Sequence, residues 1–281
     1  MSEAEASARL AVLGSPIAHS KSPALHRAAY GVLGLDWSYD AIEVAEGGLE
    51  AFLGGLDASW RGLSLTMPPK REVLPLSARR TPLVDTVGAA NTVLLADGGS
   101  EGFNTDVAGI VAAFREAGVS GLESVQVLGA GATAASVVAA VAQLGATRVL
   151  VSARDTEKAR SLEPMAAAAG VELTIRQMGM MDRSMIIPSA VVSTLPGGTP
   201  VDVVYPEPIR RGAVLFDVAY DPWPSPLAAS WAEVGGTVVS GLSMLLHQAV
   251  AQVRVFVVGD ETTPLVDEDR VVAAMRAAVG L

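Results

Sequence analysis

Lysine is rare in this chain, and its few lysines stand among other polar residues. Of the 20 lysine and arginine residues, only Lys21, Lys70 and Lys158 are lysine. A lysine ammonium is compact and can lose its proton, whereas an arginine guanidinium stays protonated. The bias therefore makes the three lysines candidates for sites that need proton transfer or a small cation, with chance retention as the alternative.

The segment that ends at Lys70 predicts a strand followed at once by a helix. Residues 62–65 have strand character and lead into Thr66, and Pro68 begins the helix that presents Lys70. A proline at the first helical position already has the backbone angle that a helix requires. Two later segments place Asn91 and Asp106 at further edges of predicted structure. These polar residues are candidates for a binding site.

Ser20 and Ser22 flank Lys21 where a helix is predicted to begin. Hydroxyl groups beside the exposed N–H groups of a helix form a good seat for a carboxylate. Simple capping of the helix by one serine is the alternative interpretation. The pattern is therefore a candidate carboxylate site that needs support from elsewhere in the chain.

A glycine-rich turn joins a predicted strand at residues 125–128 to a long apolar helix that extends to Leu144. In a turn of the form G-x-G-x-x-A, the first glycine permits the tight bend and the second lets backbone N–H groups approach a pyrophosphate. The alanine allows close packing of helix on strand. This context predicts a dinucleotide site, with a structural turn as the alternative. Its residues are Gly129, Ala130, Gly131, Ala132, Thr133 and Ala134.

The end of the next predicted strand should choose between the two nicotinamide dinucleotides. Arg154 and Lys158 could hold the 2′-phosphate of NADP, whereas Asp155 could accept from the free 2′-hydroxyl of NAD. Two cations outweigh one carboxylate, so the sequence favours NADP over NAD. A solvent-exposed helix start is the alternative role for the two cations.

Strand-like apolar runs alternate with helical patterns along most of the chain, which predicts an α/β fold with mainly parallel sheets. In the first part, strands are expected at residues 10–13, 37–44, 62–65 and 92–95, and helices at 22–32, 48–56 and from 68. In the middle part, a helix ends at Gly118, strands are expected at 125–128, 148–152, 171–175, 190–193 and 214–218, and a helix at 156–169. Two late helices, 243–257 and 267–279, have no strand between them.

This order predicts two domains. Residues 1–106 and 241–281 would form an α/β substrate-binding and catalytic domain, to which the late helices return. Residues 107–240 would form a doubly wound, Rossmann-type domain that binds the dinucleotide. We expect the chain to cross between them by short, hinge-like connections near Asp106 and Gly241.

Composition excludes several classes of protein. Half of the residues are hydrophobic, which argues against disorder, and the net charge of −10 argues against nucleic acid as a partner. The chain has no cysteine, which excludes disulfides and thiolate chemistry, and the spacing of His19, His26 and His247 predicts no metal site. The N-terminus is polar and acidic, and we find no apolar run of about 18 residues, so a cytoplasmic location without a membrane partner is expected.

Seven short motifs, taken together and in this order, resemble those of the shikimate dehydrogenase family. They are S-x-S-P from Ser20, T-x-P-x-K from Thr66, A-x-N-T around Asn91, N-T-D ending at Asp106, G-x-G-x-x-A from Gly129, D-x-x-Y ending at Tyr220, and G-x-x-M-L-x-x-Q from Gly241 to Gln248. An ordered set is far more specific than one motif. The resemblance extends from Gly14 to about Gly259, and all three lysines lie within or beside matched motifs.

The resemblance implies a reversible, NADP-dependent reduction of 3-dehydroshikimate to shikimate, a step in the biosynthesis of chorismate and the aromatic amino acids. It implies that Ser20 and Ser22 bind the substrate carboxylate and that Thr66, Asn91 and Gln248 hold ring hydroxyls, with Tyr220 lining the same site. It implies that Lys70 and Asp106 are catalytic, with Lys70 stabilising and protonating the developing alkoxide. The implied cofactor contacts include Ser193, Thr194 and Gly241. A purely structural Lys70–Asp106 ion pair is the alternative.

Four positions depart from the family pattern, and they leave the fine specificity open. They are Ser64 and Ala153, where asparagine is usual, Ser193, where asparagine commonly opens a turn, and Val107, where glycine often follows the aspartate. Two other functions therefore remain: a quinate or related polyol-acid dehydrogenase that uses NAD, and a non-catalytic protein that senses shikimate. The sequence is compatible with a monomer or a homodimer.

Overall fold

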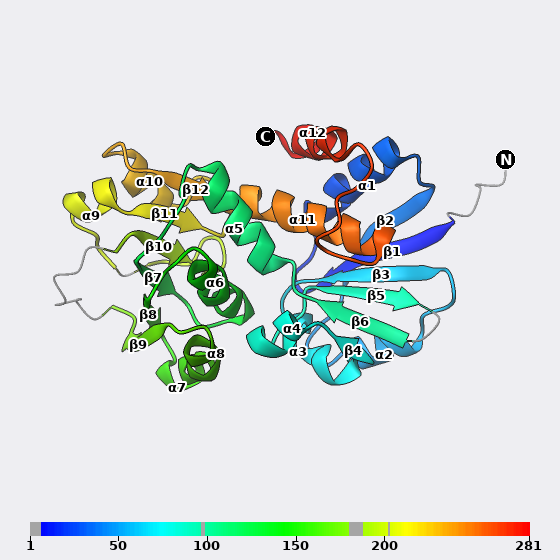
Figure 1. Cartoon of the computed structure of the whole chain (residues 1–281), viewed down its shortest axis with the longest axis horizontal. Coiled ribbons are helices and arrows are strands. Elements are labelled where there is room, and N and C mark those ends of the chain that lie inside the picture. The colour runs from blue at the N-terminus through cyan, green and yellow to red at the C-terminus, as the bar shows by residue number, and fades with distance from the viewer. Residues whose placement is uncertain (1–6, 97–98, 180–187, 202) are drawn as a thin grey trace. The chain divides into compact units, whose positions relative to one another are not determined.

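The structure is a computed structural model that describes residues 7–96, 99–179, 188–201 and 203–281. The chain divides into two compact units. Unit 1 comprises Met1–Thr105 and Leu246–Leu281, and unit 2 comprises Asp106–Leu245. Figure 1 labels the helices and strands of both. The fold is α/β, as the alternation of strand and helix patterns predicts.

Unit 1 is built on a mixed sheet of six strands. The strands are β1 (Ala8–Gly14), β2 (Trp37–Glu43), β3 (Trp60–Leu65), β4 (Arg79–Arg80), β5 (Thr92–Ala96) and β6 (Gly99–Phe103). Their order is β2-β1-β3-β5-β6-β4. β1 pairs in parallel with β2 and β3, whereas β5 is antiparallel to both β3 and β6. The first half of this sheet therefore has parallel geometry, and the second half consists of the β5–β6 hairpin with the short strand β4 parallel to β6.

The helices of unit 1 cover this sheet and include the two late helices. They are α1 (Ser22–Leu33), α2 (Leu49–Gly54), α3 (Pro69–Glu72), the 3-10 turn η1 (Leu74–Leu76), α4 (Pro82–Val87), most of α11 (Gly241–Val258) and α12 (Glu268–Val279). α1 ends at Gly34, whose φ of 67° is left-handed and suits glycine. α12 packs along α1, as Figure 1 shows. The C-terminal part of the chain thus completes the unit that the N-terminal part begins.

Unit 2 is built on a parallel sheet of six strands. The strands are β7 (Ser124–Leu128), β8 (Arg148–Ala153), β9 (Glu172–Gln177), β10 (Ala190–Ser193), β11 (Val214–Asp217) and β12 (Val238–Ser240). Their order is β12-β11-β10-β7-β8-β9, and every pair is parallel. From β7 the chain first extends the sheet in one direction and then returns to extend it in the other. This reversal is the topological switch point at which doubly wound folds bind their ligands.

Helix α5 (Asp106–Glu116) precedes the first strand of unit 2, and the other helices of this unit follow its strands. These others are α6 (Ala132–Gln143), α7 (Thr156–Ala159), the 3-10 turn η2 (Arg160–Leu162), α8 (Glu163–Ala168), α9 (Glu207–Gly212) and α10 (Pro226–Ala232). α6 contacts both α5 and α8. Its buried residues include three valines and several alanines, which allow close packing. The single helix predicted at 156–169 is wrong in detail, because Pro164 cannot continue the hydrogen bonding of α7 and the chain passes through η2 first.

Helix α11 is more apolar than the sequence analysis allowed. Its 18 residues are long and apolar enough to cross a membrane by length and composition alone, so the prediction that no such run exists is wrong. However, 61% of this stretch is buried inside the structure, as in the core helix of a soluble protein. The apolar composition is therefore weak evidence for a membrane span.

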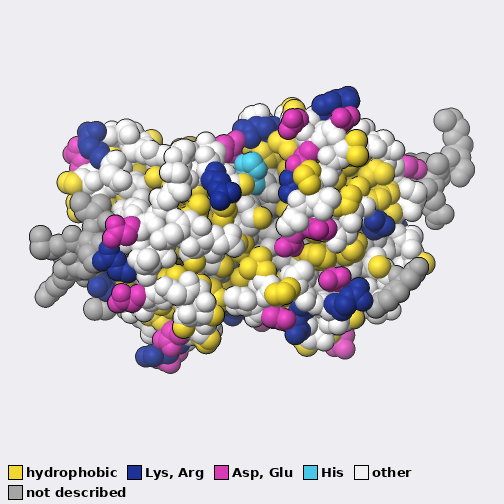
Figure 2. Space-filling view, viewed as in Figure 1, with side chains coloured by type: hydrophobic (Ala, Val, Ile, Leu, Met, Phe, Trp, Pro, Cys, Tyr) yellow, Lys and Arg dark blue, Asp and Glu magenta, His cyan; other side chains and the backbone are white. Residues whose placement is uncertain are grey.

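The charged side chains are dispersed over the face drawn in Figure 2, where basic and acidic groups lie interspersed. Several of them form exposed ion pairs, such as Arg27 with Asp40 and Arg148 with Glu123. Exposed pairs of this kind contribute about 0–1 kcal/mol each. Stability must therefore come mainly from the apolar cores of the two units.

Candidate active site

Three strand ends in unit 1 bring Thr66, Lys70 and Asn91 into one neighbourhood. The N–H of Thr66 donates to the carbonyl of Leu13 at the end of β1, at 2.9 Å. The N–H of Ala90, next to Asn91 in the chain, donates to the carbonyl of Lys70, also at 2.9 Å. Residues far apart in sequence thus meet at the edge where β1 and β3 end and β5 begins.

Gly14 is required for this convergence. A Cβ atom at Gly14 would lie 2.3 Å from the Cγ2 atom of Thr66 and 2.9 Å from the carbonyl oxygen of Met67. Real Cβ contacts are essentially never shorter than 3.0 Å, and a backbone oxygen cannot move aside cheaply. Any side chain at position 14 would therefore displace Thr66 and Met67, which lead into the helix that carries Lys70.

The two residues predicted to be catalytic are both buried. Lys70 lies on the short helix α3 and is 9% exposed, whereas Asp106 is the first residue of α5 and is 3% exposed. Lys70 belongs to unit 1 and Asp106 to unit 2. Burying a charge costs free energy unless polar partners compensate. A buried lysine and a buried aspartate are therefore candidates for a functional role.

Asn91 and Gln248 are hydrogen-bonded to each other in unit 1. The Nδ2 group of Asn91 donates to the Oε1 atom of Gln248 at 3.1 Å and to the hydroxyl of Thr105 at 2.9 Å. The Oδ1 atom of Asn91 accepts from the backbone N–H of Thr105 at 2.8 Å. Asn91 is 1% exposed and Gln248 6%. The structure thus joins two of the predicted substrate residues directly, although 157 positions separate them in the chain.

Ser20 and Ser22 lie where α1 begins. The N-cap residue is Lys21, whose side chain makes no capping hydrogen bond. The hydroxyl of Ser20 accepts from the N–H of Ser22 at 3.3 Å, and the side chain of Ser22 is almost fully buried. The arrangement places two hydroxyls beside the positive end of a helix dipole, which favours an anion there.

The glycine turn of unit 2 connects β7 to α6 as predicted. Gly129 has a left-handed φ of 108°, and a Cβ atom there would lie 2.4 Å from the hydroxyl oxygen of Thr194. Gly131 is the N-cap of α6, and a Cβ atom at this position would meet nothing within 4 Å. The turn continues through Ala130, Ala132, Thr133 and the fully buried Ala134. A helix N-terminus with open space before it fits the pyrophosphate of a dinucleotide.

β10 delivers Ser193 and Thr194 to the same switch point. Thr194 donates from its N–H and from its hydroxyl to the carbonyl of Leu128, at 2.9 and 2.8 Å. Ser193 is the last residue of β10 and is 3% exposed. The segment after β10 is thereby attached to the residue that precedes Gly129.

Asp155 caps a helix. Its Oδ1 atom accepts from the backbone N–H of Lys158 at 2.9 Å, and it is the N-cap residue of α7. The side chains of Arg154 and Lys158 are exposed on either side of it. The Asp155 carboxylate, which in the sequence favoured NAD, thus has a structural role, because an N-cap aspartate stabilises a helix by about 1 kcal/mol.

Tyr220 and Gly241 belong to the segment after β11 and to the start of α11. Asp217 accepts from the hydroxyl of Ser225 at 2.5 Å and from the N–H of Ala219 at 3.2 Å, which holds the chain that leads to the half-buried Tyr220. A Cβ atom at Gly241 would lie only 1.9 Å from the carbonyl oxygen of Val218. Glycine is therefore required at 241 by packing, whatever else it contacts.

A group of buried polar residues in unit 1 was missed by the sequence analysis. It comprises His26, Tyr30, Tyr39, Ser64, Thr92 and Gln252, which hydrogen-bond in a chain that reaches Asn91. Burial lowers the pKa of His26 from 6.5 to about 3, although the hydrogen bond to the Oε1 atom of Gln252 acts to raise it. The available signal was the i, i+4 spacing of Gln248 and Gln252, which places both amides on one face of an apolar helix.

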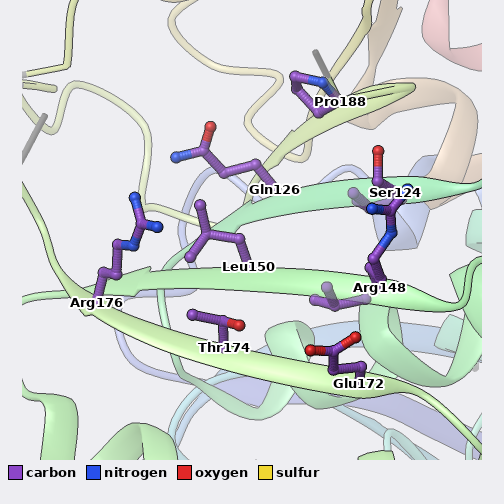
Figure 3. Close-up of a pocket in the computed structure, with 10 residues that line it drawn as sticks. Ser124, Gln126, Arg148, Leu150, Glu172, Thr174, Arg176 and Pro188 are labelled. Carbon is purple, nitrogen blue, oxygen red and sulfur yellow. The ribbon is translucent and has the colours of Figure 1, made fainter. Parts of the chain in front are cut away.

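A surface pocket lies on the unit 2 sheet (Figure 3), and no residue of the glycine turn lines it. Strand register aligns its side chains in rows, such as Gln126, Leu150 and Thr174. Gln126 already donates to Ser152 at 3.1 Å. We assign no ligand to this pocket. Among the described residues, no group of three or more histidine, aspartate or glutamate side chains could hold a metal ion.

Comparison with known proteins identifies relatives of this chain. Residues 12–93 match the model of the shikimate dehydrogenase substrate binding domain. A protein from Citrifermentans bemidjiense named shikimate dehydrogenase (NADP(+)) is 36% identical over 255 residues, which is 87% of this chain and 88% of that protein. The chain belongs to the shikimate dehydrogenase family.

Solved structures of shikimate dehydrogenases and their relatives share this fold. The enzyme from Mycobacterium tuberculosis aligns with a TM-score of 0.81 and 36% identity, covering 96% of this chain and 99% of its own. A quinate dehydrogenase from Corynebacterium glutamicum in complex with NAD aligns with a TM-score of 0.83 and 28% identity, covering 98% and 99%. A protein of this fold is thus named a quinate dehydrogenase and binds NAD in its crystal structure.

Proposed function

We propose that this protein catalyses the reversible, NADP-dependent reduction of 3-dehydroshikimate to shikimate. The observation that carries the proposal is the meeting of Thr66, Lys70, Asn91 and Gln248 in unit 1. A relative 36% identical over most of its length is a shikimate dehydrogenase (NADP(+)). A buried ammonium beside neutral hydrogen-bonding groups suits a small ring with hydroxyls and one carbonyl.

The substrate residues have separate roles in this proposal. Ser20 and Ser22 bind the carboxylate at the start of α1, and Thr66, Asn91 and Gln248 hold the ring hydroxyls. The ammonium of Lys70 stabilises the developing negative charge on the carbonyl oxygen and gives it a proton. Asp106 orients Lys70 and the neighbouring hydroxyl, and Tyr220 lines the site. When bound, the cofactor supplies the hydride.

Unit 2 would hold NADP. The pyrophosphate fits the open N-terminus of α6 at Gly129, Gly131 and the residues between and after them. Ser193, Thr194 and Gly241 complete the cofactor contacts. Arg154 and Lys158 hold the 2′-phosphate. Because one oxygen of Asp155 is engaged in capping α7, its carboxylate opposes the phosphate less than the sequence suggested.

Replacement of Arg154 by alanine should reduce the preference for NADP over NAD by about tenfold or more, because a charge-assisted bond to the 2′-phosphate is lost. The ratio of kcat/KM for the two cofactors measures this preference. Asp155→Asn is the matched variant, since it removes the charge and retains an N-cap side chain. It should change the ratio little. An unaltered ratio in Arg154→Ala would mean that another residue discriminates.

Ser20→Ala and Ser22→Ala should each raise KM for shikimate about tenfold and change kcat less, because each removes a hydrogen bond to a carboxylate. Steady-state kinetics at saturating NADP give both constants. Ser7→Ala removes an exposed hydroxyl of unit 1 that bonds only to the carbonyl of Asp36 among the contacts that the structure gives, and it serves as control. Equal KM values in all three variants would exclude the carboxylate seat.

A quinate dehydrogenase that uses NAD is the second candidate, because the quinate dehydrogenase of Corynebacterium glutamicum has the same fold. Absorbance of the nicotinamide with shikimate or quinate, and with NADP or NAD, tests all four combinations. The proposal requires shikimate with NADP to be the fastest. Ligand-dependent stabilisation without turnover in any combination would instead indicate a sensor.

The reaction would serve the biosynthesis of chorismate and the aromatic amino acids in the cytoplasm. Its substrate and cofactor are small molecules, and a monomer or a homodimer would suffice. The assay in both directions and the mass of the protein in solution test these points.

A further inference from the structure

Gln252 lies one helical turn beyond Gln248 on α11. Gln252 is 1% exposed, and all four hydrogen-bonding positions of its amide are occupied. Its Nε2 group donates to the carbonyl of Asn91 and to the hydroxyl of Thr92, both at 3.1 Å. Its Oε1 atom accepts from Ser64 at 3.0 Å and contacts the Nε2 atom of His26 at 3.2 Å. A fully satisfied buried amide holds its neighbours in one arrangement.

The backbone decides which way this amide points. The carbonyl of Asn91 can only accept, so the Nε2 group of Gln252 must face it. Its Oε1 atom must then face His26, which therefore carries its proton on Nε2. The Nδ1 atom of His26 is left as the acceptor for the hydroxyl of Tyr30, at 3.2 Å. The carbonyl group of Asn91 thus determines both the orientation of the Gln252 amide and the tautomer of His26.

The orientation of the Asn91 side-chain amide is determined in the same way, by a backbone group. The N–H of Thr105 can only donate, so the Oδ1 atom of Asn91 faces it, at 2.8 Å. The Nδ2 group of Asn91 must then donate to the Oε1 atom of Gln248. Because the Oε1 atom of Gln248 accepts from Asn91, the Nε2 group of Gln248 is the part of that amide that can donate to an oxygen of a ligand. Thr92 links the two halves, because its hydroxyl accepts from Gln252 and donates to the Oδ1 atom of Asn91 at 3.0 Å.

The outer members hold the network against the sheet. Tyr39 donates to the hydroxyl of Ser64 at 2.6 Å, and its ring stacks on that of His26 with centroids 4.0 Å apart. His26 and Tyr39 are fully buried and Ser64 is 2% exposed. These residues come from α1, β2 and β3, and Thr92 belongs to β5, so the network connects α11 to four other elements of unit 1.

We propose that Gln252 is a positioning residue, which acts through Asn91 and Thr92 to hold Asn91 and Gln248 in the orientation that receives the substrate hydroxyls. This inference rests on the proposed function. Gln252 acts by contacting Asn91 and Thr92 rather than the substrate itself.

Replacement of Gln252 by leucine tests the inference. The variant should raise KM for shikimate about tenfold while kcat falls less than threefold and KM for NADP is unchanged, because the substrate residues lose their support and the cofactor residues belong to unit 2. Gln252→Glu is the second variant. It retains the acceptor for Ser64 and His26 but places an oxygen against the carbonyl of Asn91, so it should raise KM in the same way.

Two controls separate positioning from a general loss of stability. Gln126→Leu removes a buried amide of unit 2 that donates to Ser152, and it should lower the melting temperature without changing KM for shikimate. In an Asn91→Ala background, the Gln252 substitutions should add little to KM, because their effect passes through Asn91.

Unchanged KM in both Gln252 variants, or effects of Gln252 and Asn91 that simply multiply, would overturn the inference while the wild-type enzyme remains active. A wild-type chain that turns over neither shikimate nor quinate would overturn the proposed function, and this inference with it.

Discussion

Replacement of Lys70 by alanine should lower kcat by about a hundredfold or more, with KM for shikimate changed much less. The reason is that the ammonium interacts most strongly with the alkoxide that develops during the reaction and only weakly with the neutral carbonyl. Removing it therefore raises the barrier more than it weakens binding. Steady-state kinetics in both directions, at saturating NADP or NADPH, measure the effect.

Two further lysine variants sharpen this result. Lys70→Arg should not restore kcat, because a guanidinium keeps its proton and is too large for the site of a buried ammonium. Lys158→Ala removes an exposed lysine of unit 2, and it should change KM for NADP and leave kcat near that of the wild type. Near-normal kcat in Lys70→Ala would remove Lys70 from the mechanism and leave only a structural role.

Acid should lower the stability of the protein through His26. The pKa of His26 is lowered from 6.5 to about 3 by burial, so below pH 6.5 the unfolded chain binds a proton that the folded chain does not. The free energy of unfolding should therefore be highest above pH 6.5 and fall by about 1.4 kcal/mol for each pH unit below about pH 6, or about 3 kcal/mol between pH 6 and pH 4. Urea denaturation followed by circular dichroism at several pH values measures this slope.

His26→Phe isolates the contribution of the histidine. The variant loses hydrogen bonds and should be less stable at every pH, but its free energy of unfolding should fall less steeply below pH 6. Glu268, whose pKa is lowered mainly by a hydrogen bond from Arg254, contributes acid sensitivity equally to both proteins. Identical slopes for wild type and variant would show that His26 is able to accept a proton in the folded state.

Local features of unit 2 could be predicted well from the sequence. The strand before Gly129, the turn and α6 follow from an apolar run, two glycines and an alanine-rich helix, all within about 20 residues. A missed signal was equally local. Asp155 stands directly before the predicted helix at residue 156, the position where aspartate commonly caps a helix, so its capping role could have been predicted.

The pairing of the strands in unit 1 was harder to predict from the sequence than the local features of unit 2. The run at residues 92–95 was correctly predicted to be a strand, but nothing in it indicates that β5 pairs antiparallel with β3. The short strands β4 and β6 and the helix α4 were not predicted, since two to six residues carry too little periodicity. Their place in the sheet depends on partners elsewhere in the chain.

The sequence by itself determined the fold class, through the alternation of strand and helix patterns, and the seven ordered motifs determined the family and the reaction to be tested. Each of these signals lies within a short stretch of neighbouring residues. Only the tertiary structure decided that Gln252 supports Asn91, which lies 161 positions away, and that His26 is buried and neutral. The physical reason is that a hydrogen bond depends on which donor faces which acceptor in space. That choice is made when α11 packs on the sheet, and no periodicity within either segment records it.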